Sequence, residues 1–211
     1  MLSIDTTDYF LFIGRELIIQ ALWQKLAPGG VMVLVEPGSP KGFRFVHDFR
    51  EWIRNKPREE ASIIGPCPHH GVCPQAEPHH MWCNFEQRIA HYPSTVFAKH
   101  PKQGPYQAEK FSYLIVKKGK IIESEEEAKT PAERSYFWNR LIRPARRRTG
   151  HIILDFCTRS GKLDRIVVAR SHGIEGGYKF AKKVKWGDLW PFGQRIPNKF
   201  RKEAKTGKKL F

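Results

Sequence analysis

The segment from residue 55 to residue 107 constrains the fold most, because it carries little periodic apolar pattern from which a core could form. It contains eight prolines, six histidines and three of the four cysteines of the chain. A loop of this length inside a compact domain needs some support other than a hydrophobic core. Cysteine and histidine are common ligands of structural metals, so the segment predicts a bound metal centre.

The cysteines of the predicted metal centre are widely spaced. Five residues separate Cys67 from Cys73, nine separate Cys73 from Cys83, and Cys157 lies far downstream. Structural zinc sites usually place about two to four residues between paired ligands. A 4Fe-4S cluster is also held by four cysteine thiolates, and it tolerates wider spacing because it is wider than one ion. The residues alone leave zinc and iron-sulfur open, whereas disulfides are disfavoured if the compartment is reducing.

Four histidines close to these cysteines are possible alternative ligands. They are His69, His70, His79 and His80. Each of them could replace a cysteine at a zinc ion. Four cysteines already complete a ligand set, so we expect the histidines to support the ligands, to lie on the surface or to face RNA.

The chain is strongly basic, with 37 lysines and arginines against 21 aspartates and glutamates and a formal net charge of +16. The excess is clustered, which indicates a polyanionic partner such as nucleic acid. Binding of this kind weakens steeply with salt, because each neutralised phosphate releases counterions. The candidate RNA-binding residues are Arg143, Arg146, Arg147, Arg148, Lys182, Lys183, Lys185, Arg195, Lys199, Arg201 and Lys202.

The first part of the chain predicts a helix, a strand and a second helix. Apolar residues recur at helical spacing over residues 14–26, and the run stops at Pro28-Gly29-Gly30. Residues 31–35 are apolar without alternation, which predicts a strand buried on both faces of a parallel sheet. Residues 43–53 again have helical spacing. This order is typical of an α/β doubly wound fold.

Further elements are predicted downstream. Residues 111–116 form a strand pattern, and residues 131–142 a helical pattern with proline at a tolerated first position. Residues 151–157 and 163–169 predict an antiparallel hairpin, which places Cys157 near its turn. The aromatic residues that follow alternate with basic ones and predict a tail that becomes ordered on RNA. Docking of Trp186 and Trp190 onto the domain is the alternative.

We therefore divide the chain into four parts. Residues 1–54 hold the helix-strand-helix unit, 55–107 the cluster-binding insertion, 108–172 the closing strands, a helical insertion and the hairpin, and 173–211 the basic extension. No apolar run approaches the roughly 20 residues that a membrane-spanning helix needs, so we expect no membrane partner.

Several stretches resemble one known family and occur in the same order. The stretch from Leu26 to Arg44 is similar to the late strand and helix of a class I, S-adenosylmethionine-dependent methyltransferase. Four further motifs narrow the resemblance to the methyltransferase-like proteins of the mitochondrial small ribosomal subunit, which act in its assembly. They are Pro66-Cys67-Pro68-His69-His70-Gly71-Val72-Cys73-Pro74 with Trp82-Cys83, Glu109-Lys110-Phe111-Ser112-Tyr113-Leu114, Gly150-His151-Ile152-Ile153-Leu154-Asp155-Phe156-Cys157, and Lys185-Trp186-Gly187-Asp188-Leu189-Trp190-Pro191.

The resemblance implies a fold, a cofactor and partners. The fold would be α/β, the C-terminal half of a class I methyltransferase-like (Rossmann-like) sheet with a Cys-rich insertion and a basic C-terminal extension. The family's 4Fe-4S cluster would be held by Cys67, Cys73, Cys83 and Cys157. The implied partners are small-subunit rRNA and mitochondrial ribosomal proteins, and the implied compartment is the mitochondrial matrix.

The chain departs from the methyltransferase pattern at the cofactor site. A class I methyltransferase carries a Gly-rich turn after its first strand, whereas Gly29-Gly30 precedes a strand. We therefore expect neither S-adenosylmethionine binding nor catalysis from this chain alone. The first half of the fold would lie on a separate chain, be missing from a fragment, or have been lost.

Two alternatives remain from the sequence. In the first, an active rRNA methyltransferase, a partner chain would complete a cofactor crevice lined by Glu36, Pro37 and Gly38 at the end of the central strand. In the second, the chain would be a zinc-stabilised RNA-binding module.

Overall fold

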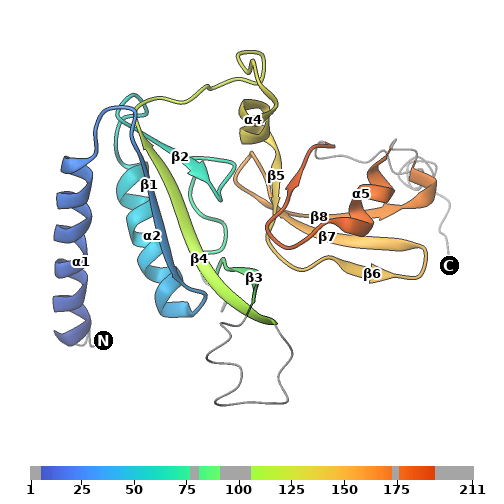
Figure 1. The fold of residues 1–211 in the computed structure, drawn as a ribbon, viewed down its shortest axis with the longest axis horizontal. Helices are drawn as coiled ribbons and strands as arrows, with labels where there is room; N and C mark the ends of the chain where they lie inside the picture. Colours follow the sequence, from blue (N-terminus) through green and yellow to red (C-terminus); the bar gives the residue numbers. More distant parts are fainter. Residues whose placement is uncertain (1–5, 77–80, 91–105, 173–175, 193–211) are drawn as a thin grey trace, which may run out of the picture.

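The computed structural model describes residues 6–76, 81–90, 106–172 and 176–192. Within them the chain forms two bodies that lie side by side, each built on its own sheet (Figure 1). The mixture of helices and strands confirms the predicted α/β class. Every strand pairing in the described parts of the chain is antiparallel.

The first sheet is organised around one long strand, β4 (Tyr106–Lys118). Strand β1 (Val31–Pro37) pairs along one edge of β4, from Val31 opposite Lys117 to Pro37 opposite Phe111. Strands β2 (Ala61–Gly65) and β3 (Phe85–Ala90) share the other edge. Because β1 and β2 are both antiparallel to β4, they run parallel to each other with β4 between them.

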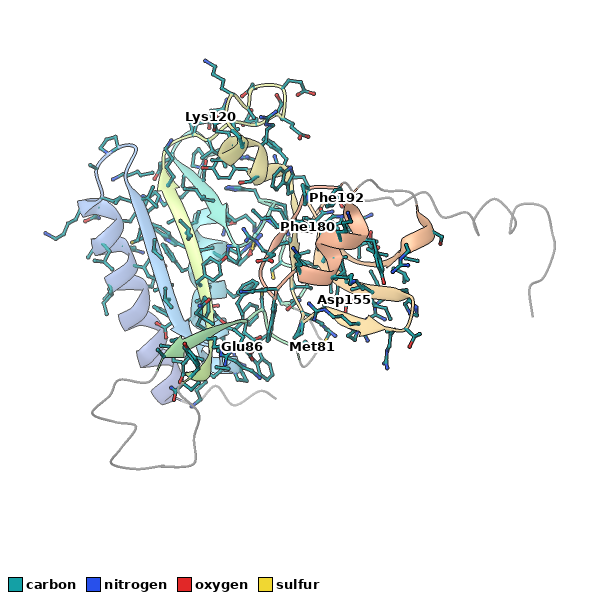
Figure 2. All side chains as sticks on the ribbon, turned by 45° about the vertical axis from the view of Figure 1, so that its right-hand side comes forward. Met81, Glu86, Lys120, Asp155, Phe180 and Phe192 are labelled. Atoms are coloured by element: carbon teal, nitrogen blue, oxygen red, sulfur yellow. The ribbon has the colours of Figure 1, made fainter. Side chains whose placement is uncertain are left out.

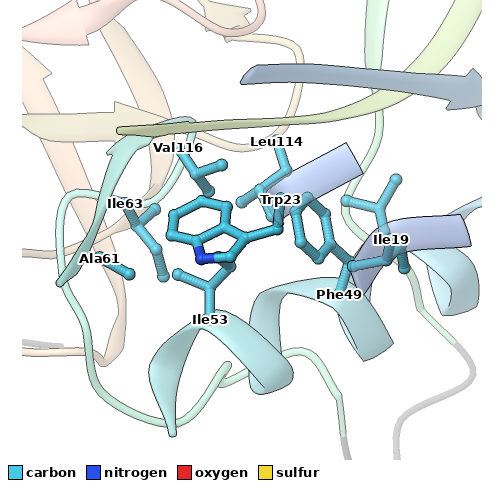
Figure 3. Close-up of a cluster of buried hydrophobic side chains, with 9 residues drawn as sticks. Ile19, Trp23, Phe49, Ile53, Ala61, Ile63, Leu114 and Val116 are labelled. Carbon is cyan, nitrogen blue, oxygen red and sulfur yellow. The ribbon is translucent and has the colours of Figure 1, made fainter. Parts of the chain in front are cut away.

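Two helices cover one face of the first sheet. They are α1 (Thr6–Lys25) and α2 (Pro40–Arg54), and the side chain of Ser39 caps α2 by accepting a hydrogen bond from the N–H of Gly42 at 3.2 Å. In Figure 3, Trp23 of α1 lies among core side chains of α2, β2 and β4. The core residues are Ile19, Trp23, Val46, Phe49, Ile53, Ala61, Ile63, Leu114 and Val116.

The prediction for residues 31–35 is wrong in two respects. The strand pairs antiparallel with β4, and only one of its faces is partly buried while the other is exposed. Met32 and Leu34 pack against the core under the helices. The intervening Val31, Val33 and Val35 point to the opposite face and are 51%, 57% and 59% exposed. A continuous apolar run therefore produced a strand with one open face.

The segment 55–107 also differs from a plain loop, because it contains β2 and β3. Both strands add to the edge of β4, which the weak apolar periodicity of the segment did not predict. Their pairing places the cysteine-bearing stretches between β2 and β3 next to the sheet.

The second sheet is organised around β7 (His151–Cys157). Strand β8 (Leu163–Ala169) pairs along all of β7 and confirms the predicted hairpin. The other edge of β7 is shared by β6 (Arg146–Arg148) and β5 (Asn139–Leu141), and β9 (Leu189–Trp190) pairs with β5. The 3-10 turn Arg170–His172 follows β8.

The helix predicted over residues 131–142 is much shorter in the structure. Helix α4 spans Pro131–Arg134, with Thr130 and Glu133 forming a capping box, and a 3-10 turn follows over Ser135–Phe137. The chain then becomes extended, because residues 139–141 pair with β7 and β9. Sheet pairing thus overrides the helical spacing of the apolar residues in this stretch.

Residues 176–192 belong to the second body instead of forming part of a tail. Helix α5 (Gly177–Lys183) packs over the sheet, and Trp190 in β9 is only 1% exposed. For Trp190 the docking alternative therefore holds. The core of the second body comprises Leu141, Ile152, Leu154, Phe156, Ile166, Val168, Ala181, Val184 and Trp190. None of the helices in the described ranges is long and apolar enough to cross a membrane.

Candidate metal centre

Four thiols converge on one cavity between the two bodies. Cys67 and Cys73 lie in the loop after β2, Cys83 lies two residues before β3, and Cys157 is the last residue of β7. All four line the same cavity. The structure thus brings together the four cysteines that the sequence singled out, and three separate stretches of chain meet there.

The cavity is small and closely surrounded by side chains. Cys73 and Cys157 are each 8% exposed. The volume of the cavity is about 30 Å³, whereas a single water needs only about 10–15 Å³. Among the residues that the structure describes, no group of three or more His, Cys, Asp or Glu side chains is arranged so that it could hold a metal ion. The thiols therefore face a shared space without closing on one point.

A buried arginine connects α2 to the cysteine loop. Arg50 is 2% exposed, and its Nε donates a hydrogen bond to the Sγ of Cys67 at 3.2 Å. Its Nη2 donates to the carbonyl oxygen of Gly71 at 2.6 Å and to that of His69 at 3.4 Å. Its Nη1 pairs with the carboxylate of Glu51 at 2.7 Å. Arg50 therefore fixes both the thiol and the backbone that follows it.

Two arginines of the second body hold the same loop from the other side. Nε of Arg140 donates to the carbonyl oxygen of Pro66 at 3.0 Å, and its Nη1 donates to that of Gly187 at 2.8 Å. Nη1 of Arg159 donates to the carbonyl oxygen of Pro68 at 2.9 Å. Arg140 also lines the cavity. The loop is thus held by guanidinium groups from both bodies.

The histidines of the loop have separate roles. Nε2 of His69 lies 3.3 Å from the Sγ of Cys157, while its buried Nδ1 has no hydrogen-bond partner among the described residues. His70 accepts a hydrogen bond from the N–H of Ile63 at 2.7 Å, so that ring nitrogen is already occupied. Burial and neighbouring arginines lower the pKa of both histidines to about 4. His79 and His80 lie outside the described residues.

The surroundings of the thiols change how readily they lose their protons. Burial raises the pKa of Cys73, Cys83 and Cys157, and the nearby Cys67 raises it further in all three. Thiolates are the form that binds metal. Four thiolates in this cavity would repel one another unless a cationic centre lay between them. The chemistry of the donor set therefore fits a metal or an iron-sulfur centre, for which Cys67, Cys73, Cys83 and Cys157 would be the ligands.

The region of Glu36, Pro37 and Gly38 is occupied by contacts within the protein. The N–H of Gly38 donates to the carbonyl oxygen of Lys110 at 2.8 Å. The carbonyl oxygen of Gly38 accepts hydrogen bonds from Nε1 of Trp82 at 2.9 Å and from Nδ2 of Asn84 at 3.2 Å. These two residues flank Cys83, so the end of β1 supports the cysteine site.

The candidate RNA-binding residues divide into two groups. Arg146 pairs with Asp155 at 3.1 Å, Arg147 donates to the carbonyl oxygens of Lys182 and Val184, and Arg143 contacts the sulfur of Met81. These three arginines therefore have partners inside the protein. Arg146 and Arg147 are exposed as well as partnered, whereas the exposed side chains of Arg148, Lys182, Lys183 and Lys185 form no hydrogen bond or ion pair among the described residues. The remaining candidates Arg195, Lys199, Arg201 and Lys202 lie outside the described residues.

Sequence reasoning missed the supporting arginines. Neither Arg50 nor Arg140 is among the candidate residues that the sequence predicts. A signal existed for Arg50, because it lies among the buried positions Val46, Phe49 and Ile53 of α2, where a charged side chain needs a partner.

Comparison with known proteins identifies the family of this chain. The family model described as mitochondrial small ribosomal subunit Rsm22 matches residues 13–191. The human mitochondrial ribosome assembly protein METTL17 is 32% identical over 84% of this chain and 36% of its own length. The Rsm22-cox11 tandem protein 2 of Schizosaccharomyces pombe is 28% identical over 84% of this chain and 27% of its own length.

A further relative is the mitochondrial ribosome assembly protein RSM22 of Saccharomyces cerevisiae, which is 26% identical over 78% of this chain and 39% of its own length. The chain thus spans between about a quarter and two fifths of these curated relatives. The family match covers most of the chain, including all four cysteines. The chain belongs to the Rsm22 family of the mitochondrial small ribosomal subunit.

Proposed function

We propose that this chain binds rRNA during assembly of the mitochondrial small ribosomal subunit, and that a 4Fe-4S cluster holds its two bodies together. The observation that carries the proposal is the meeting of Cys67, Cys73, Cys83 and Cys157 at one cavity between the bodies. Without a bound centre, the loop that carries the first two ligands has little apolar surface to offset its ordering entropy. The cluster would therefore hold the loop and the two bodies in the arrangement that binds rRNA.

Two features favour a cluster over a single zinc ion. The cavity has more room than one water site. The widely spaced cysteines suit a broad centre. Arg50 and Arg140 line the cavity, and their charges would offset the net negative charge of four thiolates around either kind of centre.

The RNA part of the proposal rests on charge. The net charge of +16 is accompanied by exposed side chains of Arg148, Lys182, Lys183 and Lys185 on the second body. Phosphate contacts of this kind supply most of the affinity of non-specific binding. The relatives are named as mitochondrial ribosome assembly proteins, so small-subunit rRNA and mitochondrial ribosomal proteins in the matrix are the partners we propose.

The decisive experiment joins cluster content to RNA binding. Wild-type chain and the Cys67→Ser and Cys157→Ser variants would be reconstituted anaerobically with iron and sulfide, with Ser160→Ala as a control near the same hairpin turn. We expect about four irons in the wild type and the control, and loss of iron together with weaker rRNA binding in both cysteine variants. Zinc in place of iron in protein purified anaerobically would support the zinc alternative. Undiminished RNA binding by a folded, metal-free chain would refute the structural role of the cluster.

One observation favours a partner for the first sheet. The outer edge of β1 pairs with no strand among the described residues, and its valines are exposed. The parallel pair β1 and β2 with β4 between them supports our assignment to the closing strands of a class I methyltransferase-like sheet. We propose that the missing strands, on the same or a separate polypeptide, pair with this edge.

A partner of this kind is also what an active rRNA methyltransferase would require. Titration calorimetry with S-adenosylmethionine, with and without the co-purifying polypeptide, tests that alternative. We expect no binding by this chain alone, because the backbone of Gly38 is already hydrogen-bonded within the protein. Binding by the isolated chain would contradict the non-catalytic assignment.

A further inference from the structure

A second cavity lies on the outer side of the second body, and it shares no residue with the metal cavity. It is an open groove of about 470 Å³ beside α5, and its lining includes Lys179, Phe180, Lys183, Asp188 and Phe192. Figure 2 shows Phe180 and Phe192 close together on this body. The groove thus combines aromatic rings, two lysines and one carboxylate.

The aromatic side of the groove is held in place from within the protein. The ring of Phe180 lies 5.7 Å from that of Trp190 and 5.5 Å from that of Phe192, both edge to face. Trp190 is buried, yet Phe180 remains 37% exposed. An aromatic ring that is fixed by its neighbours and still reaches solvent is the platform on which a nucleobase stacks in single-strand-binding proteins.

The basic side of the groove can receive the phosphates beside such a base. Lys179 and Lys183 are one helical turn apart on α5, so their side chains lie on the same face. Both are exposed, and the side chain of neither forms a hydrogen bond or an ion pair with another residue in the described ranges. Arg147 donates to the carbonyl oxygens of Lys182 and Val184, which brings the arginine strand β6 next to the same helix.

The carboxylate distinguishes a base site from a plain phosphate site. Oδ2 of Asp188 accepts a hydrogen bond from the N–H of Lys185 at 2.8 Å, whereas no donor among the described residues reaches its Oδ1. A carboxylate repels phosphate, but it accepts hydrogen bonds from the amino group of cytosine. Uracil has no amino group to offer.

We infer that this groove binds one unpaired, amino-bearing nucleobase of single-stranded RNA, with the base stacked on Phe180 and its amino group directed to Asp188. The inference rests on the proposed RNA-binding function and gives it a base-selective site. Lys179 and Lys183 contact the flanking phosphates.

The test uses the full chain with its metal centre and three labelled RNAs of equal length: a cytidine strand, a uridine strand and a duplex. Phe180→Leu keeps an apolar side chain but removes the ring. We expect it to weaken cytidine-strand binding about 5- to 150-fold, the range that stacking of one base supports, and to leave duplex binding unchanged. Equal loss on strand and duplex, or no loss, would overturn the inference.

Two further variants keep the test independent of any folding defect in Phe180→Leu. Asp188→Asn retains an acceptor and adds a donor, so it should reduce the preference for cytidine over uridine. Lys179→Ala with Lys183→Ala should lower the salt slope of strand binding by about 0.7 for each lost phosphate contact. If another protein segment occupied the groove, all three variants would bind RNA as the wild type does, and the inference would fail while the proposed function stood. Absence of RNA binding by the wild type would instead refute the proposed function.

Discussion

Nε of Arg50 donates a hydrogen bond of 3.2 Å to the Sγ of Cys67, so a charged group in the interior of α2 contacts the first cysteine of the candidate metal centre. The same guanidinium donates to the carbonyl oxygen of Gly71 at 2.6 Å. A hydrogen bond from a cation to a thiolate is stronger than one between neutral groups. Arg50 therefore shapes the loop, and it would also stabilise a metal-bound sulfur at Cys67.

Arg50→Met should reduce the iron bound per chain after reconstitution, because the loop loses its link to α2. It should also lower the free energy of unfolding by about 1–3 kcal/mol, since the carbonyl oxygen of Gly71 is left without its donor. Arg50→Lys keeps the positive charge but loses the planar guanidinium that reaches several acceptors, so we expect an intermediate result. Iron analysis and denaturant titration measure both effects.

Arg54→Met is the matched control for Arg50. Arg54 lies one turn further along α2, and its ion pair with Glu51 is partly exposed. Ion pairs of this kind contribute about 0–1 kcal/mol. Wild-type iron content and stability in Arg50→Met would contradict the role assigned to Arg50.

Removal of the metal centre should loosen the cysteine loop selectively. We expect faster amide hydrogen exchange over residues 66–76 after chelation, because this loop contains no helix or strand and would lose the centre that holds Cys67 and Cys73. Exchange in α2 and in the β7–β8 hairpin should change little, because each has its own hydrophobic core. Mass spectrometry on loaded and metal-free protein measures the difference. If the loop exchanged at the same rate in both forms, a structural role of the centre would be refuted.

Two neighbouring arginines of β6 should behave differently. Arg147→Ala should destabilise the protein, because its guanidinium donates to two carbonyl oxygens at the end of α5. Arg148 is exposed, so Arg148→Ala should leave stability unchanged and reduce the salt slope of RNA binding by about 0.7–0.9. Thermal unfolding and binding titrations at several salt concentrations separate the two. The reverse pattern would contradict this division between structural and RNA-facing arginines.

The α/β class and the hairpin that carries Cys157 could be predicted because they depend on local patterns. The apolar periods and turn residues of 14–26, 43–53 and 151–169 are contained within each segment. The open face of β1 could not be predicted in this way, because an apolar run looks the same whether one or both faces are covered. Likewise, residues 139–141 are extended only because strands distant in sequence pair with them.

The same distinction applies to the metal centre. The cysteines could be chosen as candidate ligands, because a Pro- and His-rich segment without an apolar pattern gives its thiols no place in a hydrophobic core. The partners of the arginines around them could not be assigned, because these partners are backbone carbonyl oxygens of a loop far away in the sequence, as for Arg140 with Pro66. A hydrogen bond to a backbone carbonyl oxygen requires no particular residue type in the partner, so the sequence does not reveal it.

Two adjacent isoleucines of α1 offer a direct test of which face of that helix is buried. Ile19 is 7% exposed and belongs to the first core, whereas Ile18 is 60% exposed. Ile19→Ala should lower the free energy of unfolding by about 2–5 kcal/mol. Ile18→Ala should change it by less than about 0.5 kcal/mol. Denaturant titration of both variants measures this, and similar costs would show that the exposed face is covered in solution.

His70 should make stability depend on pH between about 6.5 and 4. Burial and Arg58 lower its pKa from 6.5 to about 4, and the neutral ring accepts the N–H of Ile63. The folded state thus favours the neutral form, so the stabilisation is complete above pH 6.5 and is lost as the pH falls towards 4. Allowing for the partial exposure of the ring, the loss between about pH 7.5 and pH 5 should be about 1–2 kcal/mol.

His70→Gln isolates this effect from acid damage to the metal centre. Glutamine has an oxygen that can accept the same N–H of Ile63, but it does not titrate. Denaturant titration of wild type and variant at both pH values gives the difference in stability. When the pH is lowered, the free energy of unfolding of the variant relative to that of the wild type should shift upward by about 1–2 kcal/mol. A shift of zero would mean that the ring of His70 is as free to take up a proton in the folded protein as in the unfolded chain, and would contradict its buried acceptor role.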